Sequence, residues 1–156
     1  MALLLTILGI SLTLSILTDL RDRTIRNVVT FPAFGLALAL RALDGWWGPG
    51  GFLAGVAGAF FAFLCFVWPA IRGGLGMGDL KLACVVGACL GIAHAPLALL
   101  CIGVAGGLQA LAVLLLRGAL VDFLAGRARG IAVPYGLSIA AGTAWAVFSE
   151  RLWILA

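Results

Sequence analysis

Residues 52–71 read FLAGVAGAFFAFLCFVWPAI and include no charged side chain. A helix of about 20 apolar residues is long enough to cross the roughly 30 Å hydrocarbon core of a bilayer. The stretch therefore predicts a transmembrane helix. Similar apolar runs between charged residues predict further helices at about 2–18, 28–43, 80–93, 97–116 and 134–154.

The composition of the whole chain also indicates a membrane protein. Of its 156 residues, 64% are hydrophobic and 10% are charged, and the mean hydropathy is +1.22. Soluble domains are about 45–50% apolar and about 25% charged, so a soluble fold is excluded. A chain of this length accommodates at most about six or seven spans. We therefore expect an all-α, polytopic bundle of about six transmembrane helices, forming one domain over residues 1–156 without a soluble appendage.

The distribution of charge predicts the orientation of this bundle. The formal net charge of +4 does not indicate nucleic-acid binding, because the basic residues are scattered singly. Eight of the ten fall on one side of the predicted bundle, which the positive-inside rule places in the cytoplasm with the N-terminus outside. These eight are Arg21, Arg23, Arg26, Arg72, Lys81, Arg117, Arg127 and Arg129, and the two left for the outer side are Arg41 and Arg151.

The cysteines and glycines point to packing and not to a metal or cofactor site. The four cysteines lie in apolar runs without a CxxC pair, and His94 is the one histidine. We interpret them as buried, inert thiols and expect no cofactor and no metal; they are Cys65, Cys84, Cys89 and Cys101. Glycines of the third and fifth helices are interpreted as close-packing positions; these are Gly51, Gly55, Gly58, Gly103, Gly106 and Gly107.

Two of the six acidic residues stand at helix ends on the same side of the predicted bundle. Asp19 ends the first helix, and Asp79 opens the fourth in the string Gly76-Met77-Gly78-Asp79. Two carboxylates at matching depth suit protease chemistry in which one acid takes a proton from water while the other polarises the scissile carbonyl. Gly76 and Gly78 would let a substrate or a neighbouring helix approach Asp79 closely.

Each of these acids also has a structural interpretation. Asp19 could pair with Arg21 or Arg23, and Asp79 could favour the N-terminus of its helix. Asp22 could replace or support Asp19, although its place between two arginines is typical of a solvated loop residue. The remaining acids are interpreted as surface or interfacial residues; they are Asp44, Asp122 and Glu150.

The helix ends also predict how the pair would share a proton. Asp19 lies at the negative C-terminal end of its helix, whereas Asp79 lies at the positive N-terminal end of its own. The positive helix end favours the ionised carboxylate of Asp79, and the charge of Lys81 would favour it further. We therefore predict that Asp79 is the ionised base and that Asp19 holds the proton.

Three motifs resemble the type IV prepilin peptidases, which are GxGD aspartic proteases, and the small size resembles the short members that serve Flp/Tad pili. The motifs are Asp19 followed at +6 and +8 by Ile25 and Asn27, the string Gly76–Asp79, and Val133–Gly142 reading VPYGLSIAAG. The similarity covers essentially the whole chain. It implies that Asp19 and Asp79 are the catalytic pair and that an active-site loop re-enters near them with Pro134, Tyr135 and Gly136.

The resemblance also implies a substrate, a location and a missing activity. Prepilins keep a short leader in the cytoplasm and an apolar helix in the membrane, so the expected partners are a leader-bearing prepilin or pseudopilin and the lipid bilayer of the bacterial inner membrane. Larger members carry paired CxxC motifs and an N-methyltransferase activity. This sequence has no such motifs, so peptidase activity without methylation is expected. Arg26 stands where many members have proline. This difference concerns the local geometry of the loop and not the assignment of the two acids.

Two other functions fit parts of the sequence. A small ion-coupled channel or transporter would predict acids nearer the midplane and broken helices in repeated halves, and the sequence has neither. A catalytically silent membrane subunit of a pilus or secretion assembly would keep the fold without the activity. A cleavage assay separates that subunit from an enzyme.

Overall fold

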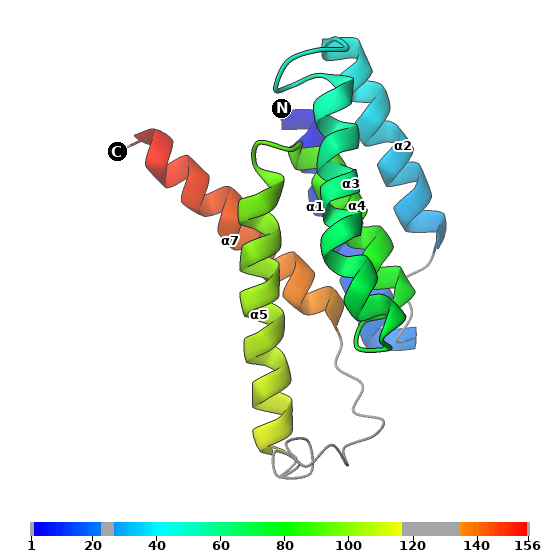
Figure 1. The fold of residues 1–156 in the computed structure, drawn as a ribbon, viewed down its shortest axis with the longest axis vertical. Coiled ribbons are helices and arrows are strands. Elements are labelled where there is room, and N and C mark those ends of the chain that lie inside the picture. Colours follow the sequence, from blue (N-terminus) through cyan, green and yellow to red (C-terminus); the bar gives the residue numbers. More distant parts are fainter. Residues whose placement is uncertain (1, 23–26, 117–134, 156) are drawn as a thin grey trace.

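The structure is a computed structural model that describes residues 2–22, 27–116 and 135–155. The described residues form six α-helices and no strand (Figure 1), which confirms the predicted all-α class. In chain order the helices are α1 (Ala2–Asp22), α2 (Asn27–Asp44), α3 (Phe52–Ile71), α4 (Met77–Leu90), α5 (Ala95–Leu116) and α7 (Tyr135–Leu155).

Both ends of α4 lie three residues before their predicted positions, since the helix runs from Met77 to Leu90 and not over 80–93, while α1 ends four residues after its predicted end. Gly76 is extended, with φ −71° and ψ 145°, and its N–H donates to the side chain of Asp79, so the helix begins before this acid. Gly91 ends the helix with φ 75° while its N–H donates to Gly87 O at 2.8 Å. A positive φ favours glycine. A tight turn into α5 follows directly.

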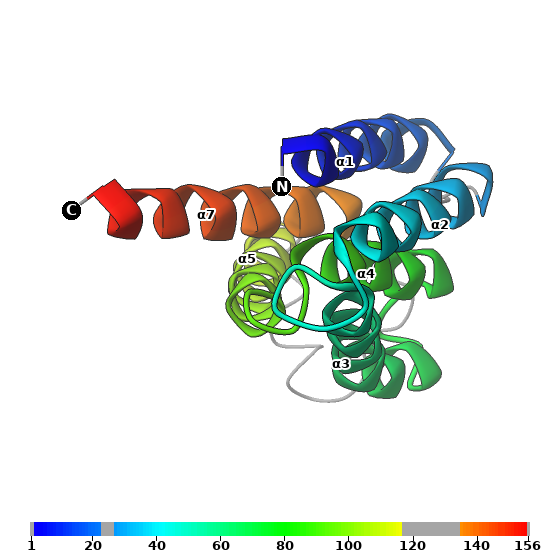
Figure 2. The same ribbon diagram turned by 90° about the horizontal axis from the view of Figure 1, so that it is seen from above.

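Helix α4 lies at the centre of the bundle (Figure 2). It packs against each of the other five helices in the described part of the chain. Most of its side chains are buried, and Leu82, Ala83 and Val86 are completely covered. With 14 residues it spans about 21 Å, less than the hydrocarbon core. Such a short helix can lie at membrane depth because protein, and not lipid, surrounds it.

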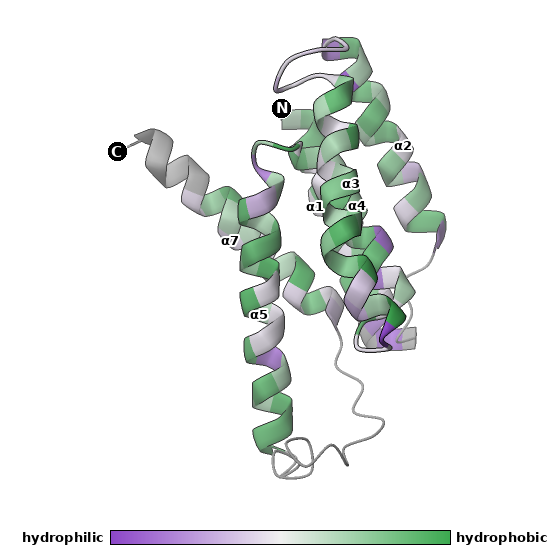
Figure 3. Cartoon of the chain, viewed as in Figure 1, coloured by the Kyte–Doolittle hydropathy of each residue, from purple (hydrophilic) through white to green (hydrophobic). Residues whose placement is uncertain are grey.

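Four helices are long and apolar enough to cross a membrane, namely α1, α2, α3 and α5. Figure 3 shows apolar residues along the bodies of the helices and hydrophilic residues mainly near their ends. Large apolar side chains such as Leu3, Phe60 and Leu100 remain exposed on the bundle, as lipid contact requires. The chain is a multi-pass membrane protein.

Glycines allow α3 and α4 to approach each other closely. A Cβ on Gly58 would collide with the backbone of Gly87, and one on Gly87 would collide with that of Gly58. The predicted packing role is therefore confirmed for Gly58, as it is for Gly55 and for Gly106, which lies against Tyr135. Two other glycines of α5 do not pack against a neighbouring helix in the described part of the chain, where a Cβ on them would meet nothing within 4 Å; these are Gly103 and Gly107.

Arg41, which the charge pattern assigned to the outer surface, is buried in α2 with only 1% of its surface exposed. Its guanidinium donates to the carbonyl oxygens of Ala88 at 2.7 Å and Cys89 at 3.0 Å, at the C-terminal end of α4. It also donates to Pro49 O at 3.2 Å and Gly51 O at 3.4 Å in the α2–α3 loop. The last carbonyls of a helix lack intrahelical partners and attract a cation, which explains why this charge is buried.

Candidate active site

The ends of three helices meet at one end of the bundle, which we call the acid end. Asp19 lies in the last turn of α1, Asp79 in the first turn of α4, and Gly136 at the start of α7. The acids are buried, with 8% of Asp19 and 9% of Asp79 exposed. They are brought together because α1 packs along both α4 and α7.

Asp79 is held by its own helix start. It occupies the third position of α4, where its Oδ2 accepts a hydrogen bond of 3.1 Å from the N–H of Gly76. An acid at this position satisfies a backbone donor that the helix leaves free and is stabilised by the positive helix end. Gly78 is half-buried in the same turn.

Asp19 is held by the start of a different helix. Its Oδ2 accepts a buried hydrogen bond of 3.0 Å from the N–H of Gly136, across 117 positions of sequence. Gly136 is the second residue of α7, so its N–H is one of the donors that the helix leaves unpaired. Gly136, one of the residues expected in the active-site loop, therefore lies beside Asp19, and Tyr135 directly precedes it in the chain.

Both donor positions are tightly packed against their acids. A Cβ on Gly136 would lie 2.8 Å from Asp19 Oδ2 and 3.2 Å from Asp19 Cβ, so a side chain there would displace the whole acid. A Cβ on Gly76 would lie 2.9 Å from Asp79 Oδ2 alone, so only the end of that side chain would have to shift. The need for glycine is therefore stronger at Gly136 than at Gly76.

The two carboxylates are close enough to interact electrostatically. Two buried like charges cannot both ionise cheaply, so a pair of this kind favours one proton shared between two acids. One ionised and one protonated carboxyl group is what hydrolysis by an aspartic protease requires.

Comparison with known proteins identifies the family. Residues 6–111 match the type IV leader peptidase family. The chain belongs to the type IV leader peptidase family. This match includes Asp19 and Asp79 and ends before α7. No curated protein and no solved structure matches the chain. The molecule is therefore a protease of the leader-peptidase type.

Lys81 of this leader peptidase contacts α2. Its Nζ donates to Asn27 Oδ1 at 2.8 Å and lies 5.4 Å from the ring centre of Phe31. Both partners belong to α2. Lys81 therefore holds the start of α2 against the start of α4, and Asn27, which the sequence singled out only as part of the Asp19 motif, has a structural role.

The helix-end argument for the shared proton also needs correction. Asp19 does lie near the C-terminal end of α1, but it also faces the N-terminal end of α7 through Gly136. Each acid of the leader peptidase thus meets a positive helix end, so the helix dipoles do not separate their roles. The sequence could not reveal this, because the contact joins segments that are distant in the chain.

Two buried hydroxyl groups have no hydrogen-bond partner among the described residues. They are Ser15 Oγ, one helical turn before Asp19, and Thr30 Oγ1, one turn into α2. The hydroxyls of Ser11 and Thr18, by contrast, donate to carbonyl oxygens in α1. An unpaired buried hydroxyl can bind a water or a substrate group. In the sequence, the four-residue spacing of Ser15 and Asp19 could have indicated that both side chains lie on the same face of the helix.

In the part of the leader peptidase that the structure describes, no group of three or more histidine, cysteine and acidic side chains could hold a metal. All four cysteines are free, and Cys89 is buried while Cys84 and Cys101 are half-buried. The prediction of a buried thiol is wrong for Cys65, which is exposed at a groove between α3 and α5.

Several residues singled out in the sequence lie outside the described residues, so the structure says nothing of them. They are Arg26, Arg117, Asp122, Arg127, Arg129 and Pro134. Asp22 ends α1 and Glu150 lies in α7, but their side chains are likewise not described.

Proposed function

We propose that this leader peptidase is a membrane-embedded aspartic endopeptidase that removes the leader of prepilin-like substrates at the cytoplasmic membrane boundary. Asp19 and Asp79 are the catalytic pair and act on a water molecule. Gly76, Gly78, Tyr135 and Gly136 shape the site, together with Pro134. The enzyme is a single-domain, Flp-type peptidase of the bacterial inner membrane, without N-methyltransferase activity and without a metal or other cofactor.

The observation that carries this proposal is the convergence of two buried acids from separate helices, each bonded to the N–H of a glycine at a helix start. Structural acids that only cap a helix do not need a second buried acid as a neighbour. Their position at one end of the bundle, and not midway along it, favours a protease over the ion-channel alternative.

Hydrolysis by this pair conserves every atom. The ionised aspartate takes a proton from water, whose oxygen attacks the scissile carbonyl carbon, while the protonated aspartate gives its proton to the carbonyl oxygen. The tetrahedral intermediate then breaks at the C–N bond as the nitrogen takes up a proton. The products are the leader with a new carboxyl group and the mature protein with a new amino group.

Cleavage of a purified prepilin by the purified protein in lipid vesicles tests the proposal. We expect Asp19→Asn and Asp79→Asn each to lower kcat by at least about a thousandfold, because either change removes one half of the acid–base pair. Both variants should remain folded, since asparagine has the same shape as aspartate and can still accept the glycine N–H.

Two further acids serve as controls. Asp44 is exposed at the end of α2 away from the acid end, so Asp44→Asn should cleave at the wild-type rate. Asp22→Ala should keep measurable turnover. Wild-type protein that cleaves no prepilin would instead support a silent assembly subunit, and activity of Asp19→Asn with loss in Asp22→Ala would show that Asp22 is the catalytic acid.

A further inference from the structure

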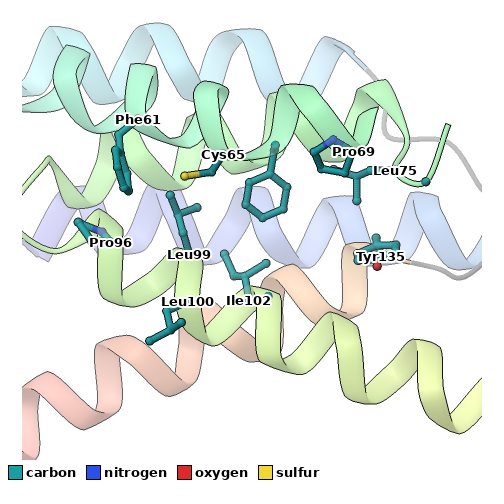
Figure 4. Close-up of a pocket in the computed structure, with 12 residues that line it drawn as sticks. Phe61, Cys65, Pro69, Leu75, Pro96, Leu99, Leu100, Ile102 and Tyr135 are labelled. Carbon is teal, nitrogen blue, oxygen red and sulfur yellow. The ribbon is translucent and has the colours of Figure 1, made fainter. Parts of the chain in front are cut away.

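A groove of about 460 Å³ lies between α3 and α5, and its outer side is open where Cys65 and Leu100 are exposed. We call it the α3–α5 groove. Figure 4 shows Phe61 and Pro96 at one end, with Pro69, Leu75 and Tyr135 at the other. Its walls carry no charged side chain. Because α3 and α5 are both candidate membrane spans, an occupant must be apolar.

The α3–α5 groove ends next to the acid end. Leu75 immediately precedes Gly76, whose N–H binds Asp79, and Tyr135 immediately precedes Gly136, whose N–H binds Asp19. Leu75 is buried in a small apolar cluster against which Tyr135 packs. Leu75 and Tyr135, which line this end of the groove, are thus the chain neighbours of the two glycines that donate to the candidate catalytic acids.

A second groove, between α5 and α7, does not share this connection. Its walls include Val104, Leu108 and Trp145, and none of its lining residues is next to Gly76 or Gly136. Of these two grooves, only the α3–α5 groove can hold a group that continues directly from a peptide bond placed at the acids.

Gly103 supplies an independent reason to expect a helix in the α3–α5 groove. Glycines on membrane helices mark places where another helix approaches closely, yet among the described residues a Cβ on Gly103 would meet nothing within 4 Å. Gly103 lines the groove. The small residue is therefore unused by the bundle itself and leaves room for a helix from another chain.

We propose that the α3–α5 groove binds the apolar helix that follows the leader in the substrate. This inference rests on the proposed function, because it requires a scissile bond between Asp19 and Asp79. The helix enters the bilayer directly after that bond and packs along α3 from Pro69 to Phe61, about 12 Å of helix. Leu75 and Tyr135 contact its first turn, and Gly103 contacts it deeper in the membrane.

Cysteine cross-linking tests the position of the substrate helix. The assay uses the full chain with Asp79→Asn, to retain the substrate, and with Cys84, Cys89 and Cys101 each changed to alanine. The probe is the prepilin that the wild type cleaves, carrying one cysteine at successive positions of its helix. We expect disulfides between Cys65 and positions three or four residues apart on one face, and none after Cys65→Ser. No cross-link at any position would overturn the proposal.

A groove-filling substitution provides a second test. Gly103→Leu should lower kcat/KM for the full prepilin on the order of tenfold, since it occupies an apolar binding site. It should leave unchanged the cleavage of a short peptide that ends just after the scissile bond. Gly35→Leu is the matched control, because Gly35 is exposed on α2, also has no neighbour within 4 Å of a Cβ, and α2 does not pack against α5.

The outcomes separate the two proposals. If the wild type cleaves no prepilin, the proposed function is wrong. If it cleaves but Gly103→Leu behaves like Gly35→Leu and Cys65 forms no cross-link, the enzyme stands and the groove does not bind the substrate helix. An effect of Gly103→Leu that depends on lipid chain length, without a cross-link, would assign the groove to a lipid and also overturn the proposal.

Discussion

Gly136 determines the position of the Asp19 carboxylate both through its N–H group and through its lack of a side chain. A Cβ there would lie 2.8 Å from Asp19 Oδ2 and 3.2 Å from Asp19 Cβ. Asp19 is buried where α1 meets α4 and α7, so it cannot retreat without losing its hydrogen bond. The size of residue 136 therefore determines where the carboxylate lies.

Replacing this glycine should lower activity while leaving the protein folded. We expect Gly136→Ala to reduce kcat by about a hundredfold, the effect of moving a catalytic group by roughly 1 Å. The measurement is prepilin cleavage at saturating substrate, with thermal unfolding in detergent to verify the fold. Gly107→Ala is the control, because a Cβ there meets nothing within 4 Å. Equal kcat values for both variants would show that Gly136 does not position Asp19.

At the scale of the element, α4 is held at both ends by residues from other helices. Lys81 near its start binds Asn27 of α2, and Arg41 of the same α2 binds the carbonyls of Ala88 and Cys89 at its end. Asp79 lies in the first turn of this helix. The α2–α4 contact thus sets both the height and the tilt of the helix that carries one candidate acid.

Loss of the Arg41 guanidinium should destabilise the fold strongly. Arg41→Gln leaves buried carbonyls of α4 without donors, each at a cost of about 1–3 kcal/mol. Arg41→Lys should be intermediate, because an ammonium group cannot reach several carbonyls in the fork geometry of arginine. The control is Arg72→Gln, since Arg72 is exposed and lies over the ring of Trp68. Unfolding in detergent should rank the stabilities as wild type and Arg72→Gln, then Arg41→Lys, then Arg41→Gln. A fully stable Arg41→Gln would contradict this account.

The elements differ in how well the sequence predicts them. The boundaries of α3 could be predicted because a long uncharged run in a membrane chain has few alternatives to a helix. The start of α4 was misplaced by three residues because it depends on a bond between Gly76 and Asp79 that hydropathy does not report. Arg41 was misassigned because an arginine near a helix end resembles a surface charge until the neighbouring helix end is known.

Of the candidate site, the sequence predicts the two acids but not the contacts that hold them. Asp19 and Asp79 stand out because the chain has six acids and an acid at membrane depth is costly, and their common side follows from the charge pattern. The contact of Gly136 with Asp19 has no local signal and was expected only through the family resemblance. The unpaired hydroxyls of Ser15 and Thr30 were missed, since serine and threonine in membrane helices usually bond to their own backbone.

For the whole molecule, the helix arrangement strengthens the predicted orientation. The end of α1, the α3–α4 loop and the start of α7 lie at the acid end, whereas the α2–α3 loop lies at the opposite end (Figure 1). Among the described basic residues, Arg21 and Arg72 are exposed at the acid end, whereas Arg41 at the opposite end is buried.

Accessibility to a charged thiol reagent tests this orientation in intact cells. In a background without the native cysteines, Gly74→Cys at the acid end should react only when the cytoplasm is opened, and Trp47→Cys should react from outside. Both side chains would be exposed. Labelling of Gly74→Cys from outside alone would contradict both the orientation and the proposed function, because the prepilin leader would then be on the other side of the membrane.

The bond between Gly136 and Asp19 has a consequence for how the protein is made. A ribosome delivers Asp19 and Asp79 to the membrane first, and the 57 residues from Asp79 to Gly136 take several seconds more at about 5–20 residues per second. Throughout this interval the nascent chain carries both acids but lacks the donor that holds one of them. The Asp19 carboxylate therefore gains its glycine donor only when α7 inserts beside α1.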